Sequence, residues 1–293
     1  MANRPTHRRA FLQQTTLVLT GAACFSADFV RAEEKSAMLR VGMMTDMHYA
    51  DKNPAGTRYY RETLAKLADA SENLADAKLD FLVELGDFID AADSVETERR
   101  YLKTIAKPFA EICDDRHYVL GNHCVDTLTK AEFLGGVGQE KSYYSSDRGE
   151  MHFVVLDACF KSDGTPYGRK NFVWTDANIP PEELEWLKSD LQGTKKKTII
   201  FAHQRLDNEG NHAVKNSPAV RKILQEAGNV WAVFQGHSHA NDYREVAGIH
   251  YCTMRAMVEK SGLANSGFAL LEIDPHGTLK INGFRDQADY QWS

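Results

Sequence analysis

The chain has 293 residues, of which 43% are hydrophobic and 26% are charged, and its formal net charge is −6. This composition predicts one ordinary globular domain with a modest elaboration. An acidic chain argues against a nucleic-acid polymer as substrate, because phosphate backbones are bound by basic surfaces.

The first 32 residues predict a twin-arginine export signal. The pair Arg8-Arg9 precedes Ala-Phe-Leu, an uncharged stretch follows over 14–27, and Val30-Arg31-Ala32 supplies the small residues that a signal peptidase needs. The apolar stretch is too short for a stable membrane span. An amphipathic N-terminal helix is the alternative, but it leaves the arginine pair unexplained. We therefore expect a periplasmic or extracellular protein.

Cleavage after residue 32 would make the mature chain more acidic. It removes four arginines and one aspartate, which leaves 31 basic against 40 acidic side chains and a net charge of −9. Bound metal ions would then supply the local positive charge that attracts a small anionic substrate. Lipid anchoring at Cys24 is not favoured, because Gly21 stands where a lipobox usually has an aliphatic residue.

Strands and helices are predicted to alternate along the mature chain. Apolar runs that end at polar residues predict strands over 39–44, 81–85, 117–120, 151–156, 198–201 and 230–234. Helical spacing of apolar residues predicts helices over 61–77, 94–113, 180–191 and 218–227. The last part, over 249–254, 267–273 and 279–283, reads as antiparallel strands. The pattern predicts a layered α/β fold with helices on its outer faces.

Short groups of possible metal ligands recur in one fixed order. They are Asp46-Met47-His48, Gly86-Asp87, Gly121-Asn122-His123, His203 and Gly236-His237-Ser238-His239. The first two groups alone also occur as ordinary turns and His203 alone as a structural histidine, whereas the Asn122-His123 motif is more specific and the His237-Ser238-His239 motif is the strongest. Four of the groups directly follow predicted strands, and sites in α/β sheets form beyond the carboxyl ends of strands. Carboxylate, amide and imidazole ligands together can hold two divalent cations for attack on phosphorus.

In this order the motifs resemble those of the calcineurin-like metallophosphoesterase superfamily. The resemblance runs from Asp46 to His239 and implies a domain over 38–285. The implied fold is a four-layer α/β/β/α sandwich, in which two packed mixed sheets are flanked by helices. The implied chemistry is hydrolysis of a phosphoric ester or anhydride by a hydroxide that bridges two metal ions.

The same resemblance assigns a role to each motif residue. The first metal would be held by Asp46, His48 and His239, the second by Asn122, His203 and His237, and Asp87 would bridge them. His123 would stabilise or protonate the leaving oxygen, and Asp90 would orient His123. Mn, Fe, Zn and Co all suit these ligands, and the resemblance favours Mn.

Cys124 departs from the superfamily pattern, which usually has Glu or Asp directly after the Asn-His pair. Two readings remain open from the sequence. Either a hydrogen bond that supports the site is missing, or Cys124 packs as a small buried group.

The segment Gly56–Arg61 resembles the manganese-dependent ADP-ribose/CDP-alcohol diphosphatase branch of the superfamily. Arginine binds phosphate in fixed geometry and tyrosine stacks on bases, so the substrate candidates in this segment are Arg58, Tyr59 and Arg61. The long loop over 157–178 adds Tyr167, Arg169 and Trp174. Ordinary packing at a helix start and within a loop is the alternative for both groups.

We therefore expect an enzyme that cleaves a phosphodiester or phosphoanhydride in a small nucleotide-like substrate. A broad phosphomonoesterase of the alkaline-phosphatase type and a cyclic-nucleotide phosphodiesterase are the alternatives that use the same centre. A metal-binding protein without turnover is an alternative of another class. The retained His123 argues against it, because a binding protein does not need a leaving-group acid.

Overall fold

The computed structural model describes residues 38–274 and 277–293. They lie in one compact unit, Ser36–Ser293. The predicted export signal over 1–32, including Cys24, lies outside the described residues. Among the residues described, no helix has the length and apolarity needed to cross a bilayer.

The helices of this unit lie where the apolar spacing predicted them, with one addition. Their bounds are α1 (Thr63–Leu74), α2 (Val95–Ala110), α3 (Lys130–Val137), α4 (Pro181–Gly193) and α5 (Ser217–Ala227), with short 3-10 turns at Tyr60–Glu62, Ala75–Ala77 and Leu263–Asn265. The addition is α3, which begins with a capping box in which Thr129 and Glu132 bond each other's backbone.

Two six-stranded sheets form the centre of the unit. The first has the order β12-β11-β10-β1-β2-β3 and the second the order β4-β5-β6-β7-β9-β8. The strand bounds are β1 (Leu39–Met44), β2 (Phe81–Glu84), β3 (Arg116–Tyr118), β4 (Tyr144–Arg148), β5 (Met151–Val155), β6 (Lys197–Phe201), β7 (Val230–Gln235), β8 (Asp242–Val246), β9 (Ile249–Thr253), β10 (Gly267–Asp274), β11 (Thr278–Arg285) and β12 (Tyr290–Trp292). Both sheets are mixed, since β1 pairs parallel with β2 and antiparallel with β10, and β4 and β8 are antiparallel edges of an otherwise parallel sheet.

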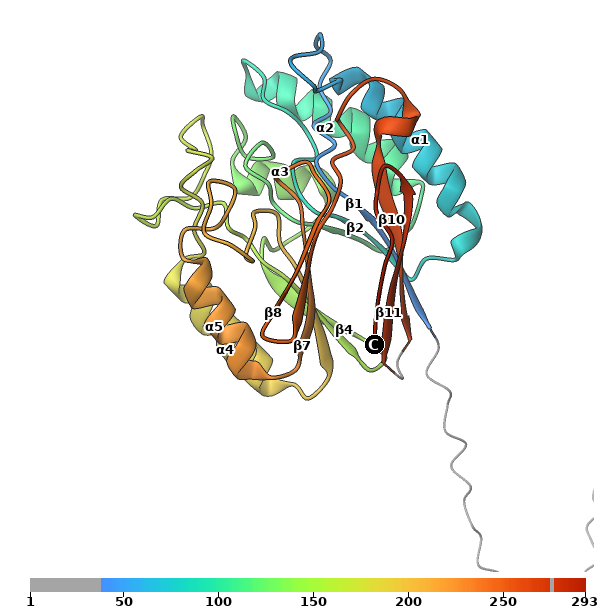
Figure 1. The fold of residues 1–293 in the computed structure, drawn as a ribbon. Coiled ribbons are helices and arrows are strands. Elements are labelled where there is room, and N and C mark those ends of the chain that lie inside the picture. The colour runs from blue at the N-terminus through green and yellow to red at the C-terminus, as the bar shows by residue number, and fades with distance from the viewer. Residues whose placement is uncertain (1–37, 275–276) are drawn as a thin grey trace, which may run out of the picture. The chain divides into compact units, whose positions relative to one another are not determined.

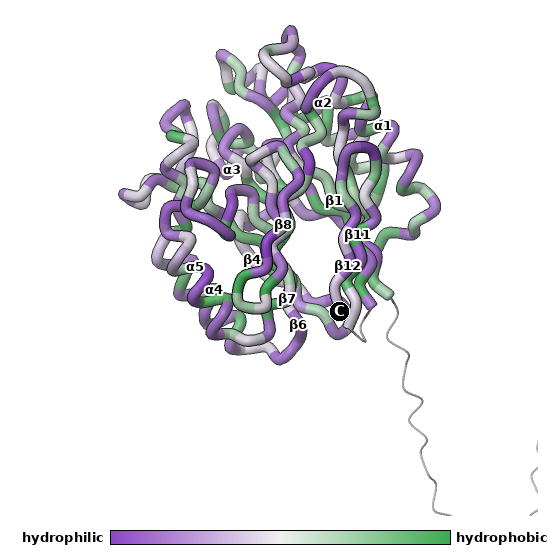
Figure 2. The backbone as a smooth tube through the Cα atoms, in the orientation of Figure 1, coloured by the Kyte–Doolittle hydropathy of each residue, from purple (hydrophilic) through white to green (hydrophobic). Residues whose placement is uncertain are grey.

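Three apolar layers hold these elements together. Side chains such as Phe81, Phe153 and Phe201 fill the space between the two sheets. Helices α1, α2 and α3 cover the outer face of the first sheet, and α4 and α5 cover that of the second (Figure 1). Hydrophobic and hydrophilic residues alternate along α4 and α5, as expected for helices buried on one face (Figure 2). The four-layer α/β/β/α prediction is confirmed.

The segment over 249–254 differs from its prediction. Strand β9 pairs parallel with β7 and only its other edge, toward β8, is antiparallel. Ala247 and Gly248, with φ of 52° and 78°, connect β8 to β9. Positive φ at both central residues is typical of a type I′ hairpin turn. Ala-Gly is not the usual sequence of such a turn, and β8 is only weakly apolar, so the sequence did not indicate this hairpin. Strands β4 and β12 were also absent from the predicted set.

Candidate metal centre

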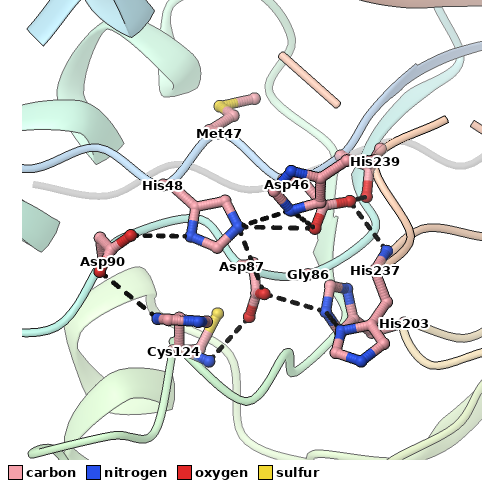
Figure 3. Close-up of polar contacts among 12 residues, drawn as sticks. Asp46, Met47, His48, Gly86, Asp87, Asp90, Cys124, His203, His237 and His239 are labelled. Carbon is pink, nitrogen blue, oxygen red and sulfur yellow. Dashed lines mark hydrogen bonds and ion pairs between the residues drawn. The ribbon is translucent and has the colours of Figure 1, made fainter. Parts of the chain in front are cut away.

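The motif residues come together at the carboxyl ends of five strands. Asp46 and His48 follow β1, Asp87 follows β2, Asn122 and His123 follow β3, His203 follows β6, and His237 and His239 follow β7. Figure 3 shows how the side chains from both sheets converge, while Met47 points away from the group. His123 and His239 are partly buried, and the other motif side chains are buried.

Asp46 directs one carboxylate oxygen at two imidazoles. Its Oδ2 accepts hydrogen bonds from Thr45 Oγ1 at 2.7 Å and from the backbone N–H of His237 at 3.0 Å. Its Oδ1 has no hydrogen-bond partner among the described residues and lies 3.2 Å from Nε2 of His239 and 3.6 Å from Nε2 of His48. The two Nε2 atoms are themselves 3.1 Å apart. These three atoms surround a common point, as ligands of one cation do.

Asp87 faces both groups of ligands with a single oxygen. Its Oδ1 accepts the backbone N–H of His123 at 2.8 Å. Its Oδ2 lies 3.1 Å from Nε2 of His203 and 3.4 Å from Nε2 of His48. Oδ2 therefore occupies the position of a ligand that two neighbouring cations share.

His203 and His237 form the second group with Asp87. Nε2 of His203 lies 3.2 Å from Nδ1 of His237. Asn122 lines the same cavity, and its buried Oδ1 has no hydrogen-bond partner among the described residues. Imidazole nitrogens that lie close together beside buried oxygens without hydrogen-bond partners are the ligands that divalent cations bind. The residues of the first and second groups therefore fit metal ions.

Three of the histidines are oriented by a partner on their other ring nitrogen. Nδ1 of His203 lies 2.9 Å from the carbonyl oxygen of Leu85. Nδ1 of His239 lies 2.7 Å from Oε1 of Glu259. Nδ1 of His48 lies 3.1 Å from Oδ2 of Asp90. Such partners fix the ring orientation and leave Nε2 free for a metal.

The loops that carry the ligands have an uncommon backbone conformation. Five of the seven proposed ligands have φ between 43° and 67°, namely Asp46, His48, Asp87, His237 and His239. Residues other than glycine are rarely left-handed, and such residues gather at functional sites. Two motif glycines allow the close packing: a Cβ on Gly121 would clash with the Asp87 carboxylate, and one on Gly236 with Asp46 and Thr45.

The histidines of the site lower the pKa values of its two buried carboxylates. Burial alone would raise the pKa of Asp46, but the nearby His239 and His203 outweigh it and hold that pKa well below its usual value. The pKa of Asp87 is lowered in the same way by His203 and His123. Both carboxylates are therefore ionised and ready to bind a cation.

His123 and Asp90 lie beside the first group. Oδ1 of Asp90 is 3.4 Å from Nδ1 of His123, and Asp90 also contacts Lys52. Burial disfavours the charged imidazole, but the carboxylates of Asp87 and Asp90 outweigh it and raise the pKa of His123. A protonated His123 at the cavity is suited to stabilise or protonate a leaving oxygen.

A cavity of about 330 Å³ opens above these residues. It is lined by Arg58, Asp87, Asn122, His123, Phe172, Trp174, His212, His237 and His239. The ring of Phe172 lies 5.6 Å from that of His123. On the other side, the His212 ring lies 5.3 Å from each of Trp174 and His237. Aromatic side chains thus flank the metal centre on two sides.

Of the six substrate candidates in the sequence, Arg58 and Trp174 line this cavity. Arg61 pairs with Asp51, and Arg169 with Glu132, both on the outside of the loops. Their charges are engaged by neighbouring acids.

The two candidate tyrosines, Tyr59 and Tyr167, make contacts within the fold and do not line the cavity. Tyr167 is buried and its hydroxyl donates to the carbonyl of Val173 at 2.9 Å, so its ring packs inside the loop. Tyr59 is half-buried, and its backbone N–H donates to the carbonyl of Val258. Both tyrosines therefore pack as the alternative interpretation expected, and Arg58 and Trp174 remain the substrate candidates of this set.

Cys124 packs as a small buried group. It is fully buried in the core beneath α1, α2 and α3, and its Sγ accepts the N–H of Phe88 at 3.4 Å. Burial and the neighbouring Glu84 raise the pKa of the thiol well above its usual value, so it is neutral. The ligand positions are complete without an acid here.

Sequence reasoning missed His212 and Glu259. His212 belongs to no motif and reaches the cavity from the loop after His203. Glu259 is 20 positions after His239 and meets it because the β8–β9 hairpin folds back. A tertiary contact of this kind leaves no local spacing signal.

A four-layer sandwich with neighbouring groups of possible metal ligands at its strand ends is the arrangement of a metal-dependent phosphoric ester hydrolase. The profile of the calcineurin-like phosphoesterase family matches residues 39–241, and the chain belongs to this family.

Two kinds of relatives share much of the chain. It is 24% identical to a manganese-dependent ADP-ribose/CDP-alcohol diphosphatase from Xenopus laevis, over 74% of this chain and 80% of that protein. A probable cyclic nucleotide phosphodiesterase from a Pseudoalteromonas species is 25% identical, over 72% and 75%. Among solved structures, a dimetal phosphatase from Danio rerio has a TM-score of 0.76 at 20% identity, and the match covers 86% of this chain and 98% of that one. The last comparison supports the fold.

Proposed function

We propose that this enzyme holds two divalent metal ions, with Mn²⁺ favoured, and hydrolyses a phosphoanhydride or phosphodiester in a small nucleotide-like substrate of the ADP-ribose or CDP-alcohol type. The observation that carries the proposal is the Oδ2 atom of Asp87, which lies within 3.4 Å of imidazoles from both ligand groups. The similarity to manganese-dependent ADP-ribose/CDP-alcohol diphosphatases supports the substrate class.

The chain supplies the ligands and the groups that position the substrate. Asp46, His48 and His239 would hold the first ion, and Asn122, His203 and His237 the second. When bound, two such ions polarise a phosphoryl oxygen and activate water as a nucleophile. His123 keeps Nδ1 toward Asp90, which leaves its Nε2 for the leaving oxygen.

The cavity walls favour a substrate with groups on both sides of phosphorus. Arg58 places a guanidinium at one wall, where it can bind a second phosphate. Trp174, whose side chain is 42% exposed, offers an aromatic face at the rim, and His212 lies against it. Stacking on such a face holds a nucleobase without reading its identity.

A comparison of four substrates with the Mn²⁺-loaded enzyme tests the proposal. We expect kcat/KM for ADP-ribose and CDP-choline to exceed that for a cyclic nucleotide and for p-nitrophenyl phosphate. A preference for p-nitrophenyl phosphate would instead support a phosphomonoesterase. The similarity to the probable cyclic nucleotide phosphodiesterase makes the cyclic nucleotide the second candidate.

Two variants separate turnover from binding alone. Asp87→Ala removes the shared ligand and His123→Ala the leaving-group acid, so each is expected to abolish or strongly reduce hydrolysis. If the metal-loaded parent hydrolyses none of the four substrates and both variants behave like it, the protein binds metal without catalysis.

We also propose that the enzyme acts outside the cytoplasm. Arg8-Arg9 and the uncharged stretch after it support export by the twin-arginine route. Replacing both arginines with lysine is expected to retain the protein in the cytoplasm, as measured by fractionation. Equal export of parent and variant would refute this route.

A further inference from the structure

Lys66 is a fully buried lysine on α1. Its Nζ donates to three backbone carbonyl oxygens, those of Met257 at 3.0 Å, Glu259 at 2.8 Å and Lys260 at 2.7 Å. An ammonium group has three N–H donors, so each has one acceptor. No carboxylate of the described residues lies within ion-pair distance of Nζ. The side chain is therefore committed to the backbone of one short segment, residues 257–260.

The 257–260 segment lies directly against the first ligand group. The backbone N–H of Val258 donates to the carbonyl oxygen of Asp46 at 3.1 Å, and that of Met257 to the carbonyl of Thr45 at 3.1 Å. The side chain of Glu259 reaches Nδ1 of His239 at 2.7 Å. One segment thus contacts both Asp46 and His239, two of the three residues proposed for the first ion.

Carbonyl oxygens that point at one place repel each other unless a cation lies between them. We propose that Lys66 is a positioning residue for the first metal position: its ammonium holds the 257–260 segment closed, so that Glu259 orients His239. The inference rests on the proposed pair of metal ions. The second position lacks this link, because the outer partner of His203 is the carbonyl of Leu85 at the end of β2.

Lys66→Met in the full-length chain tests the role, because methionine keeps an unbranched apolar side chain and removes the charge. The metal-free protein is titrated with Mn²⁺ by calorimetry, and bound Mn²⁺ is followed by electron paramagnetic resonance. We expect one of two Mn²⁺ sites to weaken by about 10- to 100-fold, the usual effect of losing a group that orients a ligand. Affinity at the other site is expected to match the parent.

Asp69→Asn is the matched control on the same helix. Asp69 is also buried, but it pairs with Arg285 of β11, and in the part of the chain that the structure describes it makes no hydrogen bond or ion pair with residues 257–260. We expect this variant to lose thermal stability and to keep both Mn²⁺ affinities. A merely structural Lys66 would give the same result as Asp69→Asn, and that outcome would overturn the proposal.

Glu259→Gln completes the test as the second corner of a double-mutant cycle. If Lys66 acts through Glu259, the double variant weakens the first site by less than the product of the two single effects. Independent effects would refute the link.

Should Lys66→Met fail to fold, Lys66→Arg carries the same test, because a guanidinium cannot place three N–H groups of one nitrogen on three carbonyls. A parent protein that binds no Mn²⁺ would refute the proposed function itself.

Discussion

Asp90 lies between His123 and His48, with Oδ1 3.4 Å from Nδ1 of the first and Oδ2 3.1 Å from Nδ1 of the second. Resemblance to the superfamily predicted only the contact with His123. The structure adds His48, so one carboxylate orients both the candidate acid and a candidate metal ligand. A change at Asp90 should therefore affect two measurable properties.

Asp90→Asn is expected to lower kcat by about 10- to 100-fold, because a neutral amide favours the charged imidazole of His123 less. Burial alone would lower the pKa of His123, but the charges of Asp87 and Asp90 outweigh burial and raise it. Loss of the Asp90 charge should therefore move the basic limb of the kcat profile to lower pH. Lys52→Gln is the control, because it removes the ammonium contacts with Asp90 Oδ1, the Ala91 carbonyl and the Tyr60 ring but keeps the Asp90 carboxylate. An unshifted profile would exclude the orienting role.

Metal binding is expected to release protons. Burial opposes protonation of His239, but the charge of Asp46 and the contact with Glu259 raise its pKa to about 9 in the metal-free protein. A metal ligand must be neutral, so Mn²⁺ displaces this proton. Affinity for Mn²⁺ should rise with pH up to about 9. Calorimetry in buffers of different ionisation enthalpy measures the release, and a heat independent of buffer at pH 7.5 would contradict it.

The same histidine gives the metal-free protein a pH-dependent stability. The pKa of His239 is about 9 in the folded chain and about 6.5 in an unfolded one. Its stabilising contribution is therefore fully present below about pH 6.5 and is lost as the pH rises through 9. Thermal unfolding without metal should show a falling midpoint over this window. His239→Gln should flatten the slope, and an equal slope would point to other groups.

Trp174→Ala is expected to weaken the use of nucleotides more than that of simple esters. Loss of one base-stacking surface costs about 1–2 kcal/mol, or roughly a 5- to 30-fold loss in kcat/KM. We expect this loss for ADP-ribose and little change for p-nitrophenyl phosphate. Val173→Ala is the control, because Val173 is similarly exposed, at 49% against 42% for Trp174, but does not line the cavity. Equal losses on both substrates would assign Trp174 to loop packing.

Cys124→Glu, which restores the usual superfamily residue type, is expected to destabilise this chain by about 3 kcal/mol or more. The carboxyl would enter a fully buried position close to Glu84, whose own pKa burial already raises well above its usual value. Cys124→Ala should cost only about 1–2 kcal/mol. Urea unfolding measures both. A Cys124→Glu variant as stable as the parent would mean that the core can hydrate this carboxyl.

The proposed ligands could be selected from the sequence because four of the five motifs directly follow a predicted strand, so a local pattern carried the information. The fold, the family and the metal-dependent hydrolase chemistry are confirmed on that basis. Lys66, His212 and Glu259 were not predictable, since each acts through a contact distant in sequence. Lys66 sits beside Leu67 in an amphipathic helix and gives no sign of burial. The helix α3 had a signal, Thr129 followed three positions later by Glu132, but its glycines hid the helical spacing.

The left-handed backbone at five of the ligands sets stability against function in this chain. Holding each such residue in the left-handed conformation costs folding free energy that glycine would not cost. Contacts of the surrounding loops must offset this cost. Selection for a robust fold alone would replace these residues. Glycine at one of these positions would relieve this local backbone cost and would also remove a proposed ligand, the pattern of a trade-off in which the chain gives up stability to keep activity.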